Sequence, residues 1–228
     1  MSSRLLQALS SSIGTKLLIA FTGLCLFVFL IGHLAGNLLF LLGPDAFNHY
    51  SHNLVSNPLV YVAEAGLILV FLLHIVKTVT MWIGNQAARP NRYVKKQWAK
   101  TKSDRSRKSL ASSTMIVTGT ITLLFVVSHL ATFKFGAYYD TTDGTMRDLY
   151  RLQLEIFSQP GYVAFYLVAM AIIFLHLWHG LSSAAQSFGV DHPQWTPRII
   201  ATGRVLAVLI GGGFFILPIY TFILARGV

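Results

Sequence analysis

The sequence predicts an all-α integral membrane protein with five membrane-spanning helices, and composition, apolar run length and turn residues all support this fold class. Of 228 residues, 54% are hydrophobic and 11% are charged, whereas soluble domains average about 25% charged residues. Five apolar stretches are long enough to cross a bilayer, which requires about 20 mainly apolar residues. We therefore expect one membrane domain that comprises residues 1–228.

The predicted spans cover, in order, residues 13–42, 59–83, 111–135, 161–185 and 199–224. The first span is too long for the core of a signal peptide and no small-residue cleavage site follows it, so it is predicted to be an uncleaved anchor. Residues that end or start helices bound the spans. They are Gly43-Pro44, Asn57-Pro58, Ala88-Arg89-Pro90, Gln159-Pro160, His192-Pro193 and Thr196-Pro197. Between the third and fourth spans, residues 148–157 are expected to form a short interfacial helix.

The distribution of basic residues predicts the orientation of the spans. Nine Lys or Arg residues and one acid, Asp104, lie between residues 89 and 108, whereas loop 43–58 has no Lys or Arg. In loop 136–160, Arg147 and Arg151 are outnumbered by four acids. The positive-inside rule then makes the N-terminus and a basic loop at 86–110 cytoplasmic, and places the other two loops and the C-terminus outside. We expect a multi-pass protein of the cell inner (plasma) membrane, and the net charge of +10 reports this orientation rather than a nucleic-acid partner.

A single cysteine, Cys25, excludes several kinds of site. The chain cannot form an internal disulfide, a cysteine-based zinc site or an iron–sulfur cluster. It also lacks the C-x-x-C-H sequence to which c-type haem is attached.

Histidines occur in each of the first four predicted spans, and their depths sort them into two pairs. Ionisable residues inside spans are costly and usually mark function. At a rise of about 1.5 Å per residue, His33 and His129 lie roughly 15 and 9 Å from the outer ends of their spans. His74 and His176 each follow an outer proline by sixteen residues, so both lie roughly 24 Å deep. Each pair draws on alternate helices, which lie diagonally across an antiparallel four-helix bundle.

This arrangement predicts that the first four helices form a bundle around two haems, each held by two histidines. Imidazole is a standard axial ligand of haem iron, and bundles build cofactor sites from facing helices. Interhelical hydrogen bonding by single histidines is the simpler alternative. A zinc or copper site is disfavoured because its ligands would lie at one depth. A proton relay is disfavoured because Glu64 is the only acid within the spans.

Several segments together resemble the diheme cytochrome b membrane-anchor subunit of succinate dehydrogenase and fumarate reductase, the succinate:quinone oxidoreductases of respiratory complex II. The likeness covers nearly the whole chain, and its motifs are specific only in combination. They are residues 32–38 (GHLAGNL), 47–50 (FNHY), 57–59 (NPL), 74 (H), 88–90 (ARP), 128–130 (SHL), 176–183 (HLWHGLSS) and 188–193 (FGVDHP).

The resemblance implies five helices and two b-type haems, with iron ligands His33 and His129 for one haem and His74 and His176 for the other. It favours His176 over His179 as the ligand, because the family's ligand precedes the motif glycine by four residues. His179 and Lys77 are then candidate partners of haem propionates. An interhelical hydrogen bond for His179 and snorkelling of the Lys77 ammonium toward the interface remain alternatives.

The resemblance further implies an electron-transfer role in the respiratory chain and the tricarboxylic acid cycle. A flavoprotein partner subunit would carry the succinate or fumarate chemistry, so no catalytic residue is expected in this chain. An iron–sulfur partner subunit would exchange electrons with the inner haem, and membrane quinone, expected to be menaquinone, with the outer one. The basic segment 89–108 is expected to dock the soluble partner or anionic lipid headgroups. Phe174 stands where some diheme fumarate reductases carry a glutamate linked to proton transfer, so that route is not expected.

The predicted quinone site lies on the outer side, because a quinone that changes redox state needs hydrogen-bond and proton partners. Asn48, His49, His52 and Glu64 supply such groups near the outer histidines. Helix capping and ordinary loop polarity are the alternative explanation for these four residues.

Two rival functions remain open at this point. The chain could be the diheme cytochrome b of another quinone-linked enzyme, such as a hydrogenase, formate dehydrogenase or nitrate reductase. A transporter or channel that uses buried histidines as proton carriers is the non-enzyme alternative. A reduced-haem absorption spectrum separates the transporter from both cytochromes.

Overall fold

The structure, a computed structural model, describes residues 2–88, 113–190 and 192–227, and these ranges are almost entirely helical. The α-helices are α1 (Ser2–Ser10), α2 (Ser12–Leu38), α3 (Pro44–Ser56), α4 (Leu59–Ala87), α6 (Met115–His129), α7 (Leu149–Phe157), α8 (Pro160–Ser187) and α9 (Trp195–Arg226). A 3-10 turn, η1 (Leu39–Leu42), extends α2, and a π-helical turn, η2 (Leu130–Lys134), extends α6. The all-α fold class is therefore confirmed.

Five of these elements are long and apolar enough to cross a membrane. They cover Ser12–Leu42, Leu59–Ala87, Met115–Lys134, Pro160–Ser187 and Trp195–Arg226. Each overlaps one predicted span, and the ends differ by a few residues. The predicted start of the third span at Ala111 and most of the basic loop 86–110 lie outside the described residues. This architecture is that of a multi-pass membrane protein.

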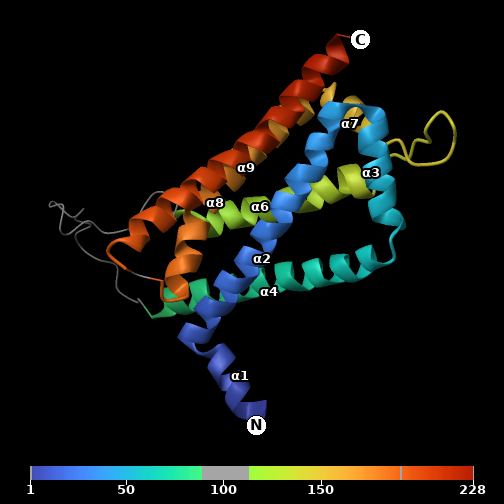
Figure 1. The fold of residues 1–228 in the computed structure, drawn as a ribbon. Helices are drawn as coiled ribbons and strands as arrows, with labels where there is room; N and C mark the ends of the chain where they lie inside the picture. The colour runs from blue at the N-terminus through green and yellow to red at the C-terminus, as the bar shows by residue number, and fades with distance from the viewer. Residues whose placement is uncertain (1, 89–112, 191, 228) are drawn as a thin grey trace.

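The helices α8 and α9 form a close antiparallel hairpin, and α2 packs against both of them (Figure 1). Glycines on α9 allow this approach, because a Cβ at Gly203 would lie 3.2 Å from Leu181, and one at Gly211 would lie 3.1 Å from Phe174. Small residues at helix contacts are typical of membrane bundles, where close van der Waals packing replaces the hydrophobic effect. Phe174 thus packs against the backbone of α9.

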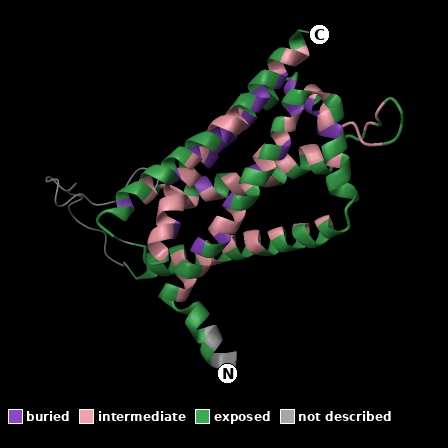
Figure 2. Ribbon diagram, in the orientation of Figure 1, coloured by how far each residue is buried: buried purple, intermediate pink, exposed green. Residues whose placement is uncertain are grey.

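Helix α4 differs from the other spans, because it packs mainly against α2 and none of its residues is buried. Figure 2 shows α4 as a helix of exposed and half-buried residues, whereas buried residues concentrate on α8 and α9. The densest apolar cluster lies where α6 and α7 meet α8, around Phe125, Phe157, Tyr166 and Met170. Helix α4 is therefore the span that the rest of the protein covers least.

Short helices cover the end of the bundle that the sequence predicts to lie outside, which is called the outer end below, and the opposite end is called the inner end. Helix α7 confirms that the segment predicted at 148–157 is helical, and its first turn is capped because Asp148 accepts a hydrogen bond from the Arg151 amide. Loop 43–58 contains helix α3, which sequence reasoning treated only as a connection. Pro44 occupies its first turn together with Asp45, and both residue types favour a helix start.

Asn48 joins these two short helices. Its Nδ2 donates to Asp148 Oδ1 at 2.9 Å, and its Oδ1 accepts from the Tyr150 backbone amide at 2.9 Å. Only 3% of Asn48 is exposed, so both halves of the amide are used inside the protein. This residue therefore holds α3 against α7 across the outer end.

Candidate functional site

The two inner histidines are held in the same way by threonines on neighbouring helices. His74 on α4 has its Nδ1 3.1 Å from Thr22 Oγ1 on α2. His176 on α8 has its Nδ1 3.1 Å from Thr118 Oγ1 on α6. Each threonine–histidine contact therefore links one helix pair of the bundle.

Each threonine hydroxyl also contacts the backbone of its own helix. Thr22 Oγ1 lies 2.7 Å from the carbonyl oxygen of Leu18, and Thr118 Oγ1 lies 3.1 Å from that of Met115. A hydroxyl has one hydrogen to donate. Where that hydrogen goes to the backbone carbonyl, the hydroxyl accepts from the N–H at Nδ1 of the histidine, and the lone pair of the neutral ring is then on Nε2.

Glycines beside the threonines give the inner rings room. A Cβ on Gly23 would lie 3.2 Å from Cε1 of His74, and a Cβ on Gly119 would lie 3.3 Å from Cε1 of His176. Both distances are tighter than ordinary carbon contacts, which are about 3.5–4.0 Å. The Thr-Gly pairs on α2 and α6 therefore fix both the hydrogen bond and the closest approach of each ring.

The two outer histidines lie directly opposite one another. The rings of His33 on α2 and His129 on α6 have centroids 5.7 Å apart at an interplanar angle of 88°. Two imidazoles on one metal ion, with metal–nitrogen bonds of about 2 Å, have ring centroids about 6 Å apart. The observed separation is therefore close to that of two axial ligands.

Aromatic rings enclose the outer pair more than polar groups do. Phe29 stacks on His33 at 5.3 Å, and Phe125 stacks on His129 at 5.6 Å. The hydroxyl oxygen of Tyr166 lies 3.3 Å from Nδ1 of His129. Asn37 Nδ2 lies 3.5 Å from His33 Nε2 but donates at 2.8 Å to the His33 carbonyl oxygen. The outer rings are thus held mainly by apolar packing.

The outer histidines paired by depth, His33 and His129, are in ring contact. The inner histidines, His74 and His176, contact Thr22 and Thr118 on the neighbouring helices. Thr22 precedes His33 by eleven residues on α2, and Thr118 precedes His129 by eleven on α6. The inner and outer levels are therefore separated by about 16 Å along both helices.

This spacing is an internal repeat that sequence reasoning missed. Residues 22–35 and 118–131 both read Thr-Gly, then nine residues, then His-Leu-Ala. The equal spacing of Thr-Gly and His could have revealed it, but His-Leu-Ala alone is too short to distinguish from chance. The threonines were also unremarkable, because a hydroxyl in a membrane helix ordinarily bonds to its own backbone.

The two predicted propionate partners lie one turn beyond the inner histidines. Lys77 follows His74 by three residues on α4, and His179 follows His176 by three on α8, and both side chains are half-buried. Beside His179, the Trp178 ring contacts the guanidinium of Arg204 on α9 at 5.2 Å. Arg204 is a further cation at this level that sequence reasoning did not select.

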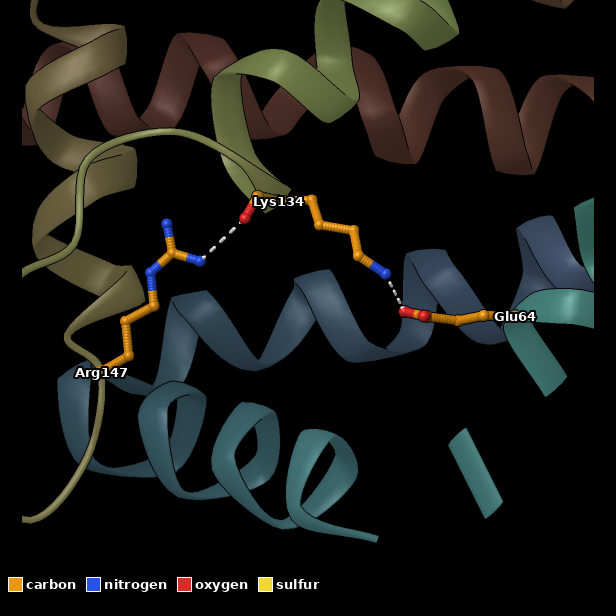
Figure 3. Close-up of polar contacts among 3 residues, drawn as sticks. All are labelled: Glu64, Lys134 and Arg147. Atoms are coloured by element: carbon orange, nitrogen blue, oxygen red, sulfur yellow. Dashed lines mark hydrogen bonds and ion pairs between the residues drawn. The ribbon is translucent and has the colours of Figure 1, made fainter. Parts of the chain in front are cut away.

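The four residues predicted to bind quinone do not converge on one point. Asn48 is buried and uses its amide to join α3 to α7, as described above. His49 and His52 are exposed on α3, and His52 Nε2 lies 3.3 Å from Ser56 Oγ. Glu64, on α4, forms an ion pair with Lys134 at the end of η2 (Figure 3). Lys134 was not selected from the sequence.

Within residues 2–88, 113–190 and 192–227, no three His, Cys, Asp or Glu side chains are grouped so that they could hold a metal ion. The four histidines of the first four spans therefore do not form one multi-ligand cluster. No family model, no curated protein and no solved structure matches this chain.

Proposed function

We propose that this chain is the membrane-anchor cytochrome b subunit of a succinate:quinone oxidoreductase. In this proposal it holds two b-type haems inside the bundle of α2, α4, α6 and α8. The iron ligands are His33 and His129 for the outer haem and His74 and His176 for the inner haem. Electrons pass through these haems between an iron–sulfur partner subunit and membrane quinone, and a flavoprotein subunit carries the succinate or fumarate chemistry.

The contact between Nδ1 of each inner histidine and a threonine hydroxyl is the observation that carries the proposal. Metal-bound histidines almost always donate their second ring N–H to a protein group, which fixes the tautomer and the ring orientation. In this proposal each hydroxyl donates its hydrogen to the backbone and accepts from the N–H at Nδ1, so each ring presents the Nε2 lone pair. The same device on two helix pairs is unexpected for histidines that merely bridge helices.

The haem, when bound, supplies one-electron transfer, and the protein residues orient it and set its surroundings. The aromatic rings around His33 and His129 exclude water from the outer pair. Lys77 and His179 are available to propionates beside the inner pair, and Arg204 adds a third cation at this level. Helix α4 has half-buried and exposed residues but no fully buried one. This is consistent with a bundle whose interior is completed by a flat cofactor.

The quinone, expected to be menaquinone, is proposed to react on the outer side. Glu64 is the acid nearest the outer level, and His49 and His52 lie on the neighbouring helix α3. Asn48 is less suited to contact the substrate, because its amide oxygen and nitrogen are already paired within the protein. The proposed quinone partners are therefore Glu64, His49 and His52.

The proposed orientation keeps the N-terminus and the inner histidines on the cytoplasmic side. On α9, 21 uncharged residues separate Arg204 from Arg226, which matches the thickness of a bilayer core at about 1.5 Å per residue. Arg204 then marks the inner interface, at the level of Trp178. The basic segment 89–108, which lies outside the described residues, is the proposed docking surface for the soluble partner subunits or for lipid headgroups.

Purification of the native complex tests this function. We expect flavoprotein and iron–sulfur subunits to copurify with the chain, a reduced-minus-oxidised spectrum with b-type haem bands, and succinate-dependent reduction of a naphthoquinone. A hydrogenase, formate dehydrogenase or nitrate reductase subunit in place of the flavoprotein would assign the chain to another quinone-linked enzyme. A colourless complex would eliminate both cytochrome assignments and leave the proton transporter.

A further inference from the structure

Arg204 lies on a tryptophan at the inner end of the hairpin that α8 and α9 form. Its guanidinium carbon is 5.2 Å from the centroid of the Trp178 ring, a distance at which a cation is attracted to the face of an indole. Arg204 is exposed on α9, and Trp178 is half-buried on α8. The guanidinium therefore lies at the surface of the bundle, on the line along which the two helices meet.

Packing between the two helices holds Trp178 in this place. Its ring lies 5.3 Å from the ring of Phe174, which packs against the backbone of α9. One residue before Arg204, a Cβ on Gly203 would lie 3.2 Å from Leu181, so the two helices are also close where the Arg204 side chain leaves α9. The indole and the guanidinium are thus placed by one helix contact rather than by a loop.

The donors of Arg204 have no acceptor in the part of the chain that the structure describes. A guanidinium carries five N–H donors and stays charged in proteins. Arg147, at the outer end, donates to three backbone carbonyls, whereas Arg204 makes no hydrogen bond or ion pair with any described residue. A permanent positive charge with unused donors is therefore available to an anion from outside the chain.

No carboxylate among the described residues lies at the inner end to compete for this cation. The six acids in residues 2–88, 113–190 and 192–227 all lie at or near the outer end, and they are Asp45, Glu64, Asp140, Asp143, Asp148 and Glu155. Arg204 lies at the level of the inner interface, 21 uncharged residues before Arg226. The anions that a bilayer presents at this level are the headgroups of acidic phospholipids, which basic pockets between membrane helices bind.

Apolar side chains continue from Arg204 toward the centre of the bilayer. Val208 follows Arg204 by four residues and Leu175 precedes Trp178 by three, so each lies one turn deeper on the same side of its helix. Their side chains are 51% and 37% exposed. An acyl chain can therefore lie along α8 and α9 below a phosphate that Arg204 holds.

We propose that Arg204, supported by Trp178, binds the headgroup phosphate of an acidic phospholipid such as phosphatidylglycerol where α8 and α9 meet. Trp178 follows His176 by two residues, so the indole and the imidazole lie on different sides of α8. Helix α9 is also outside the four helices that carry the paired histidines. The proposal concerns the lipid-facing side of the protein, so it does not depend on the proposed function.

The test is a lipid titration of the purified, delipidated protein, with any subunits that copurify, followed by native mass spectrometry. Dioleoyl-phosphatidylglycerol and dioleoyl-phosphatidylcholine are compared in wild type, Arg204→Gln and Arg204→Lys. Arg226→Gln is the matched control, because Arg226 lies at the other end of α9 and its guanidinium also lies over an aromatic ring, that of Phe222, at 4.3 Å. Excess inorganic phosphate, added as a competitor, separates a lipid site from a site for a free anion.

We expect wild type to bind the first phosphatidylglycerol more tightly than phosphatidylcholine, and Arg204→Gln to bind it about fivefold more weakly than wild type. Arg204→Lys should lose less, because the charge remains, and Arg226→Gln should bind like wild type. Unchanged affinity in Arg204→Gln, equal affinity of wild type for both lipids, or an equal loss in Arg226→Gln would overturn the site.

Two further outcomes would replace the lipid by another ligand. Inorganic phosphate should not displace the lipid, because it lacks the acyl chains that lie along α8 and α9, and displacement would assign the site to a free anion. Loss of a copurifying subunit from Arg204→Gln, with lipid affinity unchanged, would assign Arg204 to a protein contact.

Discussion

The inner histidine pair comes from α4 and α8 and the outer pair from α2 and α6, and the two pairs have different surroundings. At the inner level, Nδ1 of each ring lies 3.1 Å from a threonine hydroxyl and each ring rests against a glycine. At the outer level, His33 and His129 face each other directly inside a group of phenylalanine rings, with Tyr166 and Asn37 at longer distances. The internal repeat therefore keeps the spacing between Thr-Gly and His along α2 and α6, but the rings at the two levels have different surroundings.

This difference concerns how each ring is oriented. At the inner level, one hydroxyl contact on each ring sets its orientation. At the outer level, the rings are shielded by apolar packing, and an ion pair between Glu64 and Lys134 lies further toward the end of the bundle.

Among the substitutions that test the difference between the two levels, those of the inner threonines are expected to have the largest effect. Thr118→Val or Thr22→Val removes the hydroxyl but keeps the shape, so Nδ1 of the inner histidine loses its acceptor. We expect the inner haem to be lost 10–100 times more readily, with the outer haem unaffected, measured as the rate of haem transfer to apomyoglobin. Thr120→Val is the control, because this exposed hydroxyl bonds only to its own helix at 2.8 Å. Equal loss in the control would assign the effect to helix packing.

A smaller effect is expected at the outer level from Tyr166→Phe. The tyrosine oxygen is 3.3 Å from His129 Nδ1, so this bond is longer than the inner ones. We expect the outer haem to dissociate about two to ten times faster, with the inner haem unchanged, in the same transfer measurement. Tyr162→Phe, on the exposed side of α8, should leave both rates alone. An effect as large as that of Thr118→Val would remove the distinction between the two levels.

The smallest expected effect is in the outer loop and depends on pH. Hydrogen bonds from Thr141 and Thr145 lower the pKa of Asp143 to about 2. Because this pKa lies below the ordinary value of 3.8, the ionised carboxylate stabilises the loop fully above about pH 4, and this stabilisation is lost as the pH falls through 2.

Amide exchange at Thr145, whose N–H donates to Asp143 at 3.2 Å, measures this contribution. Asp143→Ala should exchange faster than wild type at pH 6, and the difference should shrink toward pH 2. The haem spectra should not change, because the loop lies beyond both histidine levels. A difference between the two proteins that is the same at pH 2 and pH 6 would contradict the role of the carboxylate.

The spans and the histidine levels could be predicted because they depend on additive properties of the chain. Hydropathy and length define a membrane helix, and a fixed rise per residue converts sequence position into depth. The same reasoning predicted helix α7 from its amphipathic pattern. It overlooked α3, although Pro44 and Asp45 both favour a helix start, because thirteen polar-rich residues between two spans satisfy the pattern of a loop equally well.

The partners of the histidines could not be predicted, because they depend on contacts between helices. Thr22 and Thr118 became candidates only when α2 and α6 were placed beside α4 and α8. The ion pair of Lys134 with Glu64 joins residues 70 positions apart, so it too depends on how the helices pack. Asn48 was selected for its polarity, but its burial between α3 and α7 is a consequence of tertiary packing.

Haem counting in paired histidine variants tests the central claim most directly. We predict two haems per chain in wild type and one in either His129→Ala or His176→Ala. Removing both members of one pair, His33 with His129, should still leave one haem, whereas removing one from each pair, His129 with His176, should leave none. A haem that survives in the cross-pair variant, or two haems lost in the within-pair variant, would contradict the pairing.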